Sequence, residues 1–177
     1  MRDQLLTLIP EFDWVQDEDL REQCIRTWEV GLERGGWTVA DLETIPFTLL
    51  IPDCPIHFAD HVRAVTHTCA GVADAFETVY GDRNELDRDV LMAGALLHDV
   101  GKLLEYARDA DGQVVKSAQG HILRHPISGT VLAAEQGLPD SVLHCIVAHS
   151  KEGEAVKRTK ESVIIHHADF TNFETLK

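Results

Sequence analysis

The sequence predicts an all-α fold made of successive amphipathic helices. Apolar residues recur every three or four positions along most of the chain, and residues that favour helix ends separate these segments. Strand signals are confined to one short stretch, residues 113–115. We therefore expect about six to eight helices, a higher helix content than that of an average soluble protein.

Length and charge restrict the classes of ligand. With 177 residues, the chain is long enough for one domain with a substantial core, and its hydrophobic content of 44% is ordinary. The formal net charge of −14 argues against non-specific binding of nucleic acid polymers or anionic membranes. An anionic substrate must therefore be attracted by a local cationic patch or by a metal ion.

Several features predict a cytoplasmic location. The first residues lack the pattern of a signal peptide, and no apolar run approaches the length of a membrane span. The cysteines are scattered without a CxxC pair, which is typical of reduced thiols.

Residues 1–52 are expected to form an N-terminal helical extension. Its main helix starts at the acidic residues from Asp17 and ends at the glycines at 35–36. The apolar face of this helix consists of Leu20, Cys24, Trp28 and Leu32. We expect this face to pack on the rest of the protein; the alternative is the interface of a homodimer or a lid. The proline-rich segment 45–55 cannot form one regular element and is predicted to be a linker.

Residues 53–177 are expected to form the main helical domain. Its first helix runs from about residue 56 to 79, and its apolar face includes His61, which therefore points inward. A second helix, from 86 to about 106, carries a long apolar run. A turn signal then leads into a small hairpin arm at residues 113–115.

Three more helices complete this domain. The first has His125 at its N-cap and Pro126 as its first residue. Another opens near Pro139, and the charged loop 151–160 leads to the last helix, from about Glu161.

The apolar run of the second helix ends abruptly in His98 and Asp99, and Lys102 follows one turn later. On a helix these three side chains address one spot. A buried carboxylate without a partner costs several kcal/mol, and a metal ion can take both the carboxylate and the imidazole. The alternative is a capped polar pair at a helix end, with Lys102 as a solvated cation favoured by the helix dipole.

Further histidines and acids fall on the inward faces of other helices. A single one would more often be a satisfied core residue than a ligand, but several that converge each need a partner. Imidazole and carboxylate donors without thiolate suit a transition metal, and the set is too rich for a four-ligand structural zinc site. The candidate metal ligands are His61, His98, Asp99, His125, His149 and Asp169.

These residues resemble the pattern H…HD…D of the HD superfamily of metal-dependent phosphohydrolases. The match consists of His61, of His98 and Asp99 within Leu-Leu-His-Asp-Val-Gly-Lys, and of Asp169, and it spans roughly residues 56–174. The resemblance implies an HD-domain helical bundle, to which the N-terminal extension is added.

Members of this superfamily with two metals insert further histidines, which His125 and His149 match. Where some members have another histidine directly after the second of these, this chain has Ser150. The metal implied is Fe, Mn, Zn, Co or Ni, as one ion or two. The implied ligands are His61, His98, Asp99 and Asp169 for one ion and Asp99, His125 and His149 for the other, with Asp99 as the bridge.

The resemblance implies hydrolysis of a phosphoester of a nucleotide or another small phosphorylated metabolite, with water activated by one or two metal ions. Asp99 and Lys102 are the expected catalytic residues, and Lys102 contacts a substrate phosphate. Arg63 or Lys151 is expected to hold a second phosphate or the remote end of the ligand. The expected partner is this small substrate, without nucleic acid polymer or membrane.

Two other functions fit the same residues. One is a di-iron oxygenase, since some proteins similar to this superfamily hold a di-iron centre. The other is a non-catalytic regulatory module that contains metal and binds a nucleotide. The roles of three further histidines are left open. His57 either joins the site or lies at its entrance. His121 is an alternative ligand to His125, although His125 is preferred, and His166 is expected to contact the metal ligands and not the metal itself.

Overall fold

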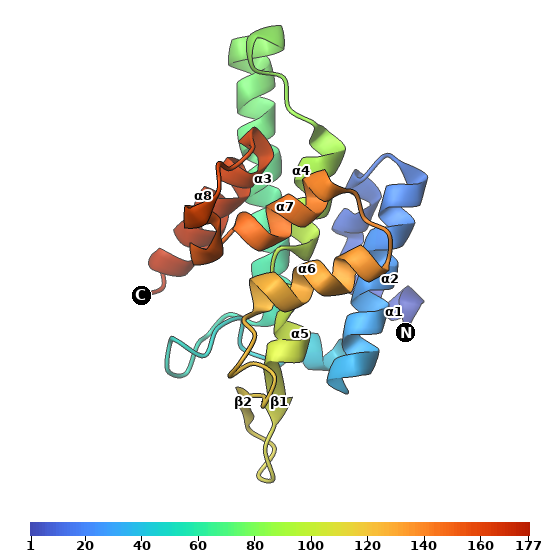
Figure 1. The fold of residues 1–177 in the computed structure, drawn as a ribbon, viewed down its shortest axis with the longest axis vertical. Coiled ribbons are helices and arrows are strands. Elements are labelled where there is room, and N and C mark those ends of the chain that lie inside the picture. Colours follow the sequence, from blue (N-terminus) through green and yellow to red (C-terminus); the bar gives the residue numbers. More distant parts are fainter.

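The computed structural model describes residues 1–177, and the all-α prediction is confirmed (Figure 1). The helices are α1 (Arg2–Leu8), α2 (Glu18–Gly35), α3 (Phe58–Tyr80), α4 (Arg88–Leu97), α5 (Lys102–Glu105), α6 (His125–Glu135), α7 (Asp140–Ala148) and α8 (Lys160–Glu174). Short 3₁₀ helices lie at Pro10–Trp14, Val39–Glu43, Gly81–Asn84 and Lys151–Ala155. None of the helices combines the length and the hydropathy needed to cross a membrane.

The expected hairpin arm is the one sheet of the protein. Its strands β1 (Tyr106–Arg108) and β2 (Val114–Lys116) pair antiparallel, with Tyr106 opposite Lys116. The arm projects from the end of the molecule that carries α5 (Figure 1).

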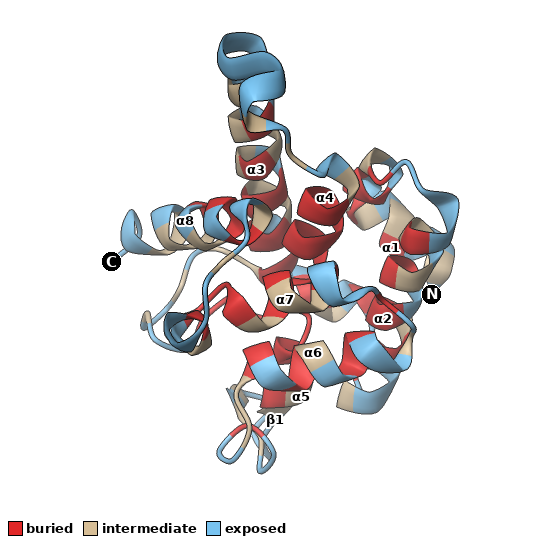
Figure 2. Cartoon of the chain, turned by 45° about the horizontal axis from the view of Figure 1, so that its top comes forward, coloured by how far each residue is buried: buried red, intermediate tan, exposed pale blue.

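Helix α4 forms the centre of the bundle (Figure 2). Every residue from Val90 to Leu97 is buried, and α2, α3, α7 and α8 pack around it. Gly94 allows α7 and α8 to pack closely on α4, because a Cβ there would lie 2.7 Å from side-chain atoms of both Cys145 and Ile165. The C-terminal end of α4 therefore lies in the middle of the protein.

The prediction of one continuous helix from 86 to 106 is wrong. The chain turns after α4, and α5 begins only at Lys102. In the turn, hydrogen bonds span three residues, such as the one from the Lys102 N–H to the Asp99 carbonyl at 2.8 Å. Gly101 permits this turn to touch α6, since a Cβ on Gly101 would lie 2.1 Å from the His125 carbonyl oxygen.

The remaining helix boundaries lie close to their predicted positions. Helix α6 begins at His125 itself and Arg124 is its N-cap, so the predicted N-cap was wrong by one residue. Assigned helix ends commonly vary by that much. Pro126 lies in the first turn of α6, α7 starts at Asp140, and α8 starts at Lys160.

Residues 1–52 pack on the bundle, as expected for the apolar face of α2. Trp28 is fully buried, and its Nε1–H donates a hydrogen bond to the Leu96 carbonyl of α4 at 3.0 Å. A contiguous core of 40 buried hydrophobic residues extends from Leu5 to Ala168. A division of the chain at residue 52 stays a prediction.

Candidate metal centre

The turn after α4 places His98 and Asp99 in the buried middle of the bundle. Nδ1 of His98 lies 2.6 Å from the carbonyl oxygen of Ala95. Because a carbonyl oxygen only accepts hydrogen bonds, Nδ1 carries a proton, so the lone pair of the neutral imidazole is on Nε2, which faces the site.

Three side chains converge around Nε2 of His61, which α3 supplies. This atom lies 3.3 Å from Nε2 of His98, 3.3 Å from Oδ2 of Asp99 and 3.2 Å from Oδ1 of Asp169. Two imidazoles and two carboxylates that converge in this way can hold a divalent transition metal ion. The His61 half-site consists of His61, His98, Asp99 and Asp169, whose ligand atoms all lie within 4.8 Å of one another.

The other carboxylate oxygen of Asp99 faces a second group. Oδ1 lies 3.2 Å from Nε2 of His125 and 3.7 Å from Nε2 of His149. The His125 half-site consists of Asp99, His125 and His149, whose ligand atoms also lie within 4.8 Å of one another. Nε2 of His149 is buried without a hydrogen-bond partner. A buried lone pair that faces a carboxylate and has no partner fits a metal ligand.

Burial and neighbouring charges set the protonation states of the centre. Burial, together with the neighbouring histidines, lowers the pKa of His149 to about 3, so this imidazole is neutral at pH 7. Burial alone would raise the pKa of Asp99, but the ammonium of Lys102 holds it well below its ordinary value. At Asp169 burial acts in the same direction, but the hydrogen bond with His61 helps to lower the pKa to about 2. Neutral imidazole and ionised carboxylate are the forms that bind metals.

Lys102 and the proline-rich segment close one side of the centre. Nζ of Lys102 lies 2.6 Å from Oδ2 of Asp99 and 2.6 Å from the carbonyl oxygen of Phe47. The Phe47 ring stacks on His61, with ring centroids 4.2 Å apart. The segment 45–55, predicted only as a linker, therefore forms a wall of the site. Its single aromatic residue was the one available signal.

Glu105 on α5 is a second residue that sequence reasoning missed. Its Oε2 accepts hydrogen bonds from the backbone N–H and from the Nδ1–H of His125, at 2.6 and 2.7 Å. Burial would raise the pKa of Glu105, but its hydrogen bonds with His125 outweigh burial and lower it to about 2, so the carboxylate is ionised at pH 7. No local feature of the sequence indicates this contact, because a continuous helix would turn Glu105 away from Asp99.

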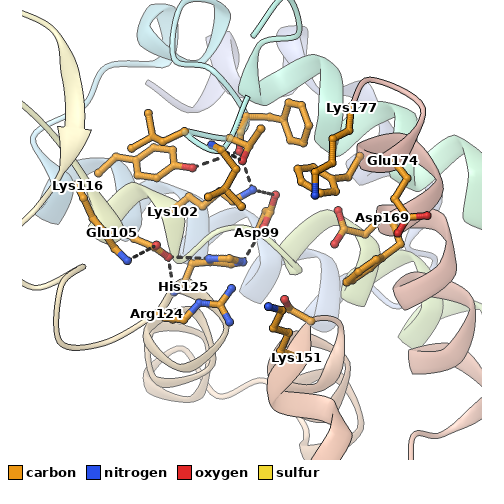
Figure 3. A pocket seen from close by; sticks show the side chains of 18 residues that line it. Asp99, Lys102, Glu105, Lys116, Arg124, His125, Lys151, Asp169, Glu174 and Lys177 are labelled. Carbon is orange, nitrogen blue, oxygen red and sulfur yellow. Dashed lines mark hydrogen bonds and ion pairs between the residues drawn. The ribbon is translucent and has the colours of Figure 1, made fainter. Parts of the chain in front are cut away.

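A cavity of about 370 Å³ opens beside the centre, and Asp99, His125 and Asp169 form part of its wall (Figure 3). Its other acids are Glu105 and Glu174. Its cations are Lys102, Lys116, Arg124, Lys151 and Lys177, and its apolar and aromatic residues are Phe47, Leu49, Leu50, Tyr106, Phe170 and Phe173. In a chain of net charge −14, five cations gathered in one cavity can attract an anionic substrate locally. The lining suits a small anionic ligand with a flat or apolar part.

The two cations predicted to bind substrate lie in different places. Lys151 lines the cavity. Arg63 does not, because it lies two residues after His61 and thus about 200° further round α3. Its Nε pairs with the buried carboxylate of Glu11 at 2.9 Å. Its position does not support the prediction that Arg63 binds substrate, and we withdraw it.

Of the histidines left open, His166 contacts the centre, and it does so through the backbone. Its Nδ1 lies 2.6 Å from the carbonyl oxygen of His149. His121 is exposed, whereas His125 belongs to a half-site. His57 is the N-cap of α3 and lies outside the cavity.

Comparison with known proteins gives one family and three relatives. The sequence model of the HD domain matches residues 58–171. A dihydroneopterin 2',3'-cyclic phosphate phosphodiesterase of Methanocaldococcus jannaschii is 31% identical over 111 residues, which cover 62% of this chain and 43% of that protein. The 3'-5' exoribonucleases YhaM of Bacillus pumilus and Bacillus licheniformis are 27% and 29% identical over 123 residues, covering 63% of this chain and 36% of each relative. The chain thus spans less than half the length of these relatives, and no solved structure matches it significantly.

Proposed function

The chain belongs to the HD-domain family, and on this basis we propose that it is a metal-dependent hydrolase that cleaves a phosphoester of a nucleotide or another small phosphorylated metabolite. One observation carries the proposal. The two carboxylate oxygens of Asp99 face two different histidine groups, Oδ2 the His61 half-site and Oδ1 the His125 half-site. A carboxylate in this position is suited to bridge two cations.

The donor set fits divalent transition metals. It combines imidazoles and carboxylates without a thiolate, which is compatible with Fe, Mn, Zn, Co or Ni. The unpartnered, buried Nε2 of His149 is a further feature that a cation would satisfy. We propose that each half-site holds one ion. Such ions, when bound, lower the pKa of water and neutralise charge on a phosphoryl oxygen.

Lys102 is the side chain best placed to bind a transferred phosphoryl group. Its ammonium lies at the cavity wall and donates hydrogen bonds to Asp99 and to the Phe47 carbonyl. An ammonium has three N–H donors, so one is left for a phosphate oxygen. We propose that this donor stabilises negative charge that develops during phosphoester cleavage.

The far side of the cavity is suited to hold the rest of the substrate. Lys151 and Arg124 lie across from Lys102 and can bind a second anionic group (Figure 3). Phe170 and Phe173 on α8 also line the cavity and are suited to contact a flat ring. A cavity of about 370 Å³ suits a ligand the size of a nucleotide. Among the relatives, one is named for a small cyclic phosphate and two for exoribonuclease activity. We favour the small substrate because the net charge of −14 disfavours a polyanion.

The test is an activity screen on protein purified without chelator and loaded with Mn²⁺ or Co²⁺. Nucleoside monophosphates, 2',3'-cyclic phosphates and a short RNA are incubated with it, and products are separated by chromatography. We expect metal-dependent cleavage of a small phosphoester. Asp99→Ala should lose metal and activity together, while its helical circular-dichroism spectrum is retained.

Other outcomes of this screen would contradict parts of the proposal. Full turnover by Asp99→Ala would exclude the proposed centre. Cleavage of RNA alone would overturn the small substrate. Oxygen consumption by iron-loaded protein without phosphoester cleavage would favour an oxygenase. Tight nucleotide binding without any product would favour a regulatory module.

A further inference from the structure

We propose that Glu105 is a positioning residue for His125, on which the His125 half-site depends. This inference rests on the proposed function, because that half-site is proposed to hold the second ion. None of the residues of the HD pattern itself supplies this contact.

The contacts of Glu105 fix both the protonation and the orientation of His125. Oε2 of Glu105 lies 2.7 Å from Nδ1 of His125. A carboxylate accepts hydrogen bonds, so the proton of the imidazole is on Nδ1, and Nε2 keeps its lone pair. That Nε2 lies 3.2 Å from Oδ1 of Asp99, on the side where a shared ion would lie. Carboxylates in this relation to a histidine orient it and make it a stronger ligand.

His125 needs an outside acceptor because of its place in the chain. His98 and His149 follow α4 and α7, and their Nδ1 atoms lie 2.6 and 2.7 Å from the carbonyl oxygens of Ala95 and Ile146, three residues earlier. His125 is the first residue of α6, so no earlier turn of its own helix can supply such a carbonyl. Glu105 takes that place, and it brings a full negative charge.

Glu105 is itself held in place by the segment that follows it. Oε1 lies 3.4 Å from Nζ of Lys116 on β2. The Glu105 carbonyl accepts a hydrogen bond from the Ser117 N–H at 2.8 Å, and Gly120 packs so closely that a Cβ on it would lie 2.3 Å from that carbonyl oxygen. The hairpin arm therefore has a role at the centre: it fixes the carboxylate that orients His125.

A purely structural role for Glu105 is the competing explanation. Its Oε2 also accepts the backbone N–H of His125 at 2.6 Å, which anchors the start of α6. Such an anchor would affect the stability of the protein and would leave the metal affinities of the two half-sites equal to those of the wild type. The two roles can therefore be distinguished by measuring the affinity of the protein for the first and for the second bound metal ion.

The experiment compares Glu105→Gln with wild type and with Glu11→Gln. The glutamine oxygen can still accept both hydrogen bonds, so this variant removes the charge and keeps the shape. Glu11 is a matched control, because it is also a buried carboxylate in contact with a histidine, His67, but lies outside the centre. Co²⁺ binding is followed by calorimetry and visible absorption, and bound metal is counted by elemental analysis.

We expect wild type and Glu11→Gln each to bind two ions, and we expect the affinity for each ion to be the same in the two proteins. Glu105→Gln should keep the first equivalent unchanged and bind the second about 10- to 100-fold more weakly. His125→Ala should show the same selective loss, and adding Glu105→Gln to it should produce no further loss. That non-additivity is the signature of one residue acting through the other.

Two results would overturn the inference, and they are distinguishable. If Glu105→Gln binds both ions like wild type, whether or not its melting temperature falls, Glu105 is only an anchor of α6, and the proposed function is untouched. If wild type itself binds a single ion, the two-ion part of the proposed function is wrong, and the positioning role is lost with it.

Discussion

The Phe47 ring lies almost parallel to the His61 imidazole, with the ring planes 20° apart and the centroids separated by 4.2 Å. The carbonyl oxygen of the same residue accepts a hydrogen bond from Lys102. One residue of the proline-rich segment thus contacts both a candidate metal ligand and the candidate phosphate-binding cation. Phe47 itself is 1% exposed, so the segment is anchored by burial at this point.

We expect Phe47→Leu to weaken metal binding at the His61 half-site. The substitution keeps an apolar side chain and the backbone carbonyl, so the free energy of unfolding should fall by only about 1 kcal/mol. The flat face that orients the imidazole is lost, and the first Co²⁺ equivalent should bind about 10-fold more weakly in a calorimetric titration. Phe12→Leu is the control, because Phe12 is fully buried but does not line the cavity. Equal metal affinities in the two variants would contradict the prediction.

The candidate ligands could be predicted because each is a polar residue on an apolar face. His61 lies on the buried face of α3, and His98 and Asp99 interrupt an apolar run, so each signal is local. The structure brings these residues together with the other three candidates. That any of them binds a metal stays a prediction.

Glu105 could not be predicted, because its position depends on the turn at Gly101. On a continuous helix, Glu105 would lie six residues after Asp99 and about 240° further round the axis, facing away from the centre. The close approach of Gly101 to α6 breaks the helix and redirects the side chain. That approach is a tertiary contact, and nothing in the local sequence reveals it.

The position of Arg63, by contrast, follows from local helix geometry. A residue two positions from an inward-facing histidine on a helix must face elsewhere. The position of Phe47 could not be predicted for a third reason. Its segment has no regular spacing of apolar residues that would show which side chains point inward, so only tertiary packing determines where Phe47 lies.

Lys102→Met should impair catalysis and also destabilise the metal-free protein. The ammonium is the main partner of the buried Asp99 carboxylate, at 2.6 Å, and removal of one member of a buried ion pair costs about 3 kcal/mol. A bound metal can replace that partner, so most of the lost stability should return when Mn²⁺ is added. Loss of the phosphate contact should lower kcat by about 100-fold.

The measurements are urea unfolding with and without Mn²⁺ and steady-state kinetics on the substrate found in the screen. Lys160→Met is the control, since Lys160 is an exposed lysine that donates only to the Glu85 carbonyl. If kcat is the same in Lys102→Met and Lys160→Met, the catalytic role of Lys102 must be abandoned.

Lys151→Ala should weaken substrate binding, and Arg63→Ala should not. Lys151 lines the cavity, so removing its charge should raise KM about 10-fold and leave kcat within about two-fold. Arg63 pairs with Glu11 outside the cavity, so its removal should lower stability and leave KM unchanged. Steady-state kinetics of both variants measure KM and kcat, and thermal unfolding measures their stability. A raised KM in Arg63→Ala would restore the role that its position argues against.

Glu11 should make the stability of the protein depend on pH in the acidic range. Burial alone would raise the pKa of this carboxyl, but hydrogen bonds from its own backbone N–H, His67 and Arg63 outweigh burial and lower it. A carboxyl whose pKa is lower in the folded than in the unfolded protein stabilises the fold above the unfolded pKa, about 4.3 for glutamate, and loses this effect as the pH falls through the folded pKa. Charged hydrogen bonds of this kind contribute roughly 2 kcal/mol. We therefore expect Glu11→Gln to be less stable than wild type by about that amount at pH 7.

The difference between the two proteins should shrink steadily below about pH 4.3, because wild type then protonates the group that the variant lacks. Urea unfolding of both proteins between pH 7 and pH 3 measures this difference. Glu43→Gln, at an exposed carboxylate, should match wild type at every pH. A difference between wild type and Glu11→Gln that is constant over the whole range would show that Glu11 acts through its shape and packing, and not through its charge.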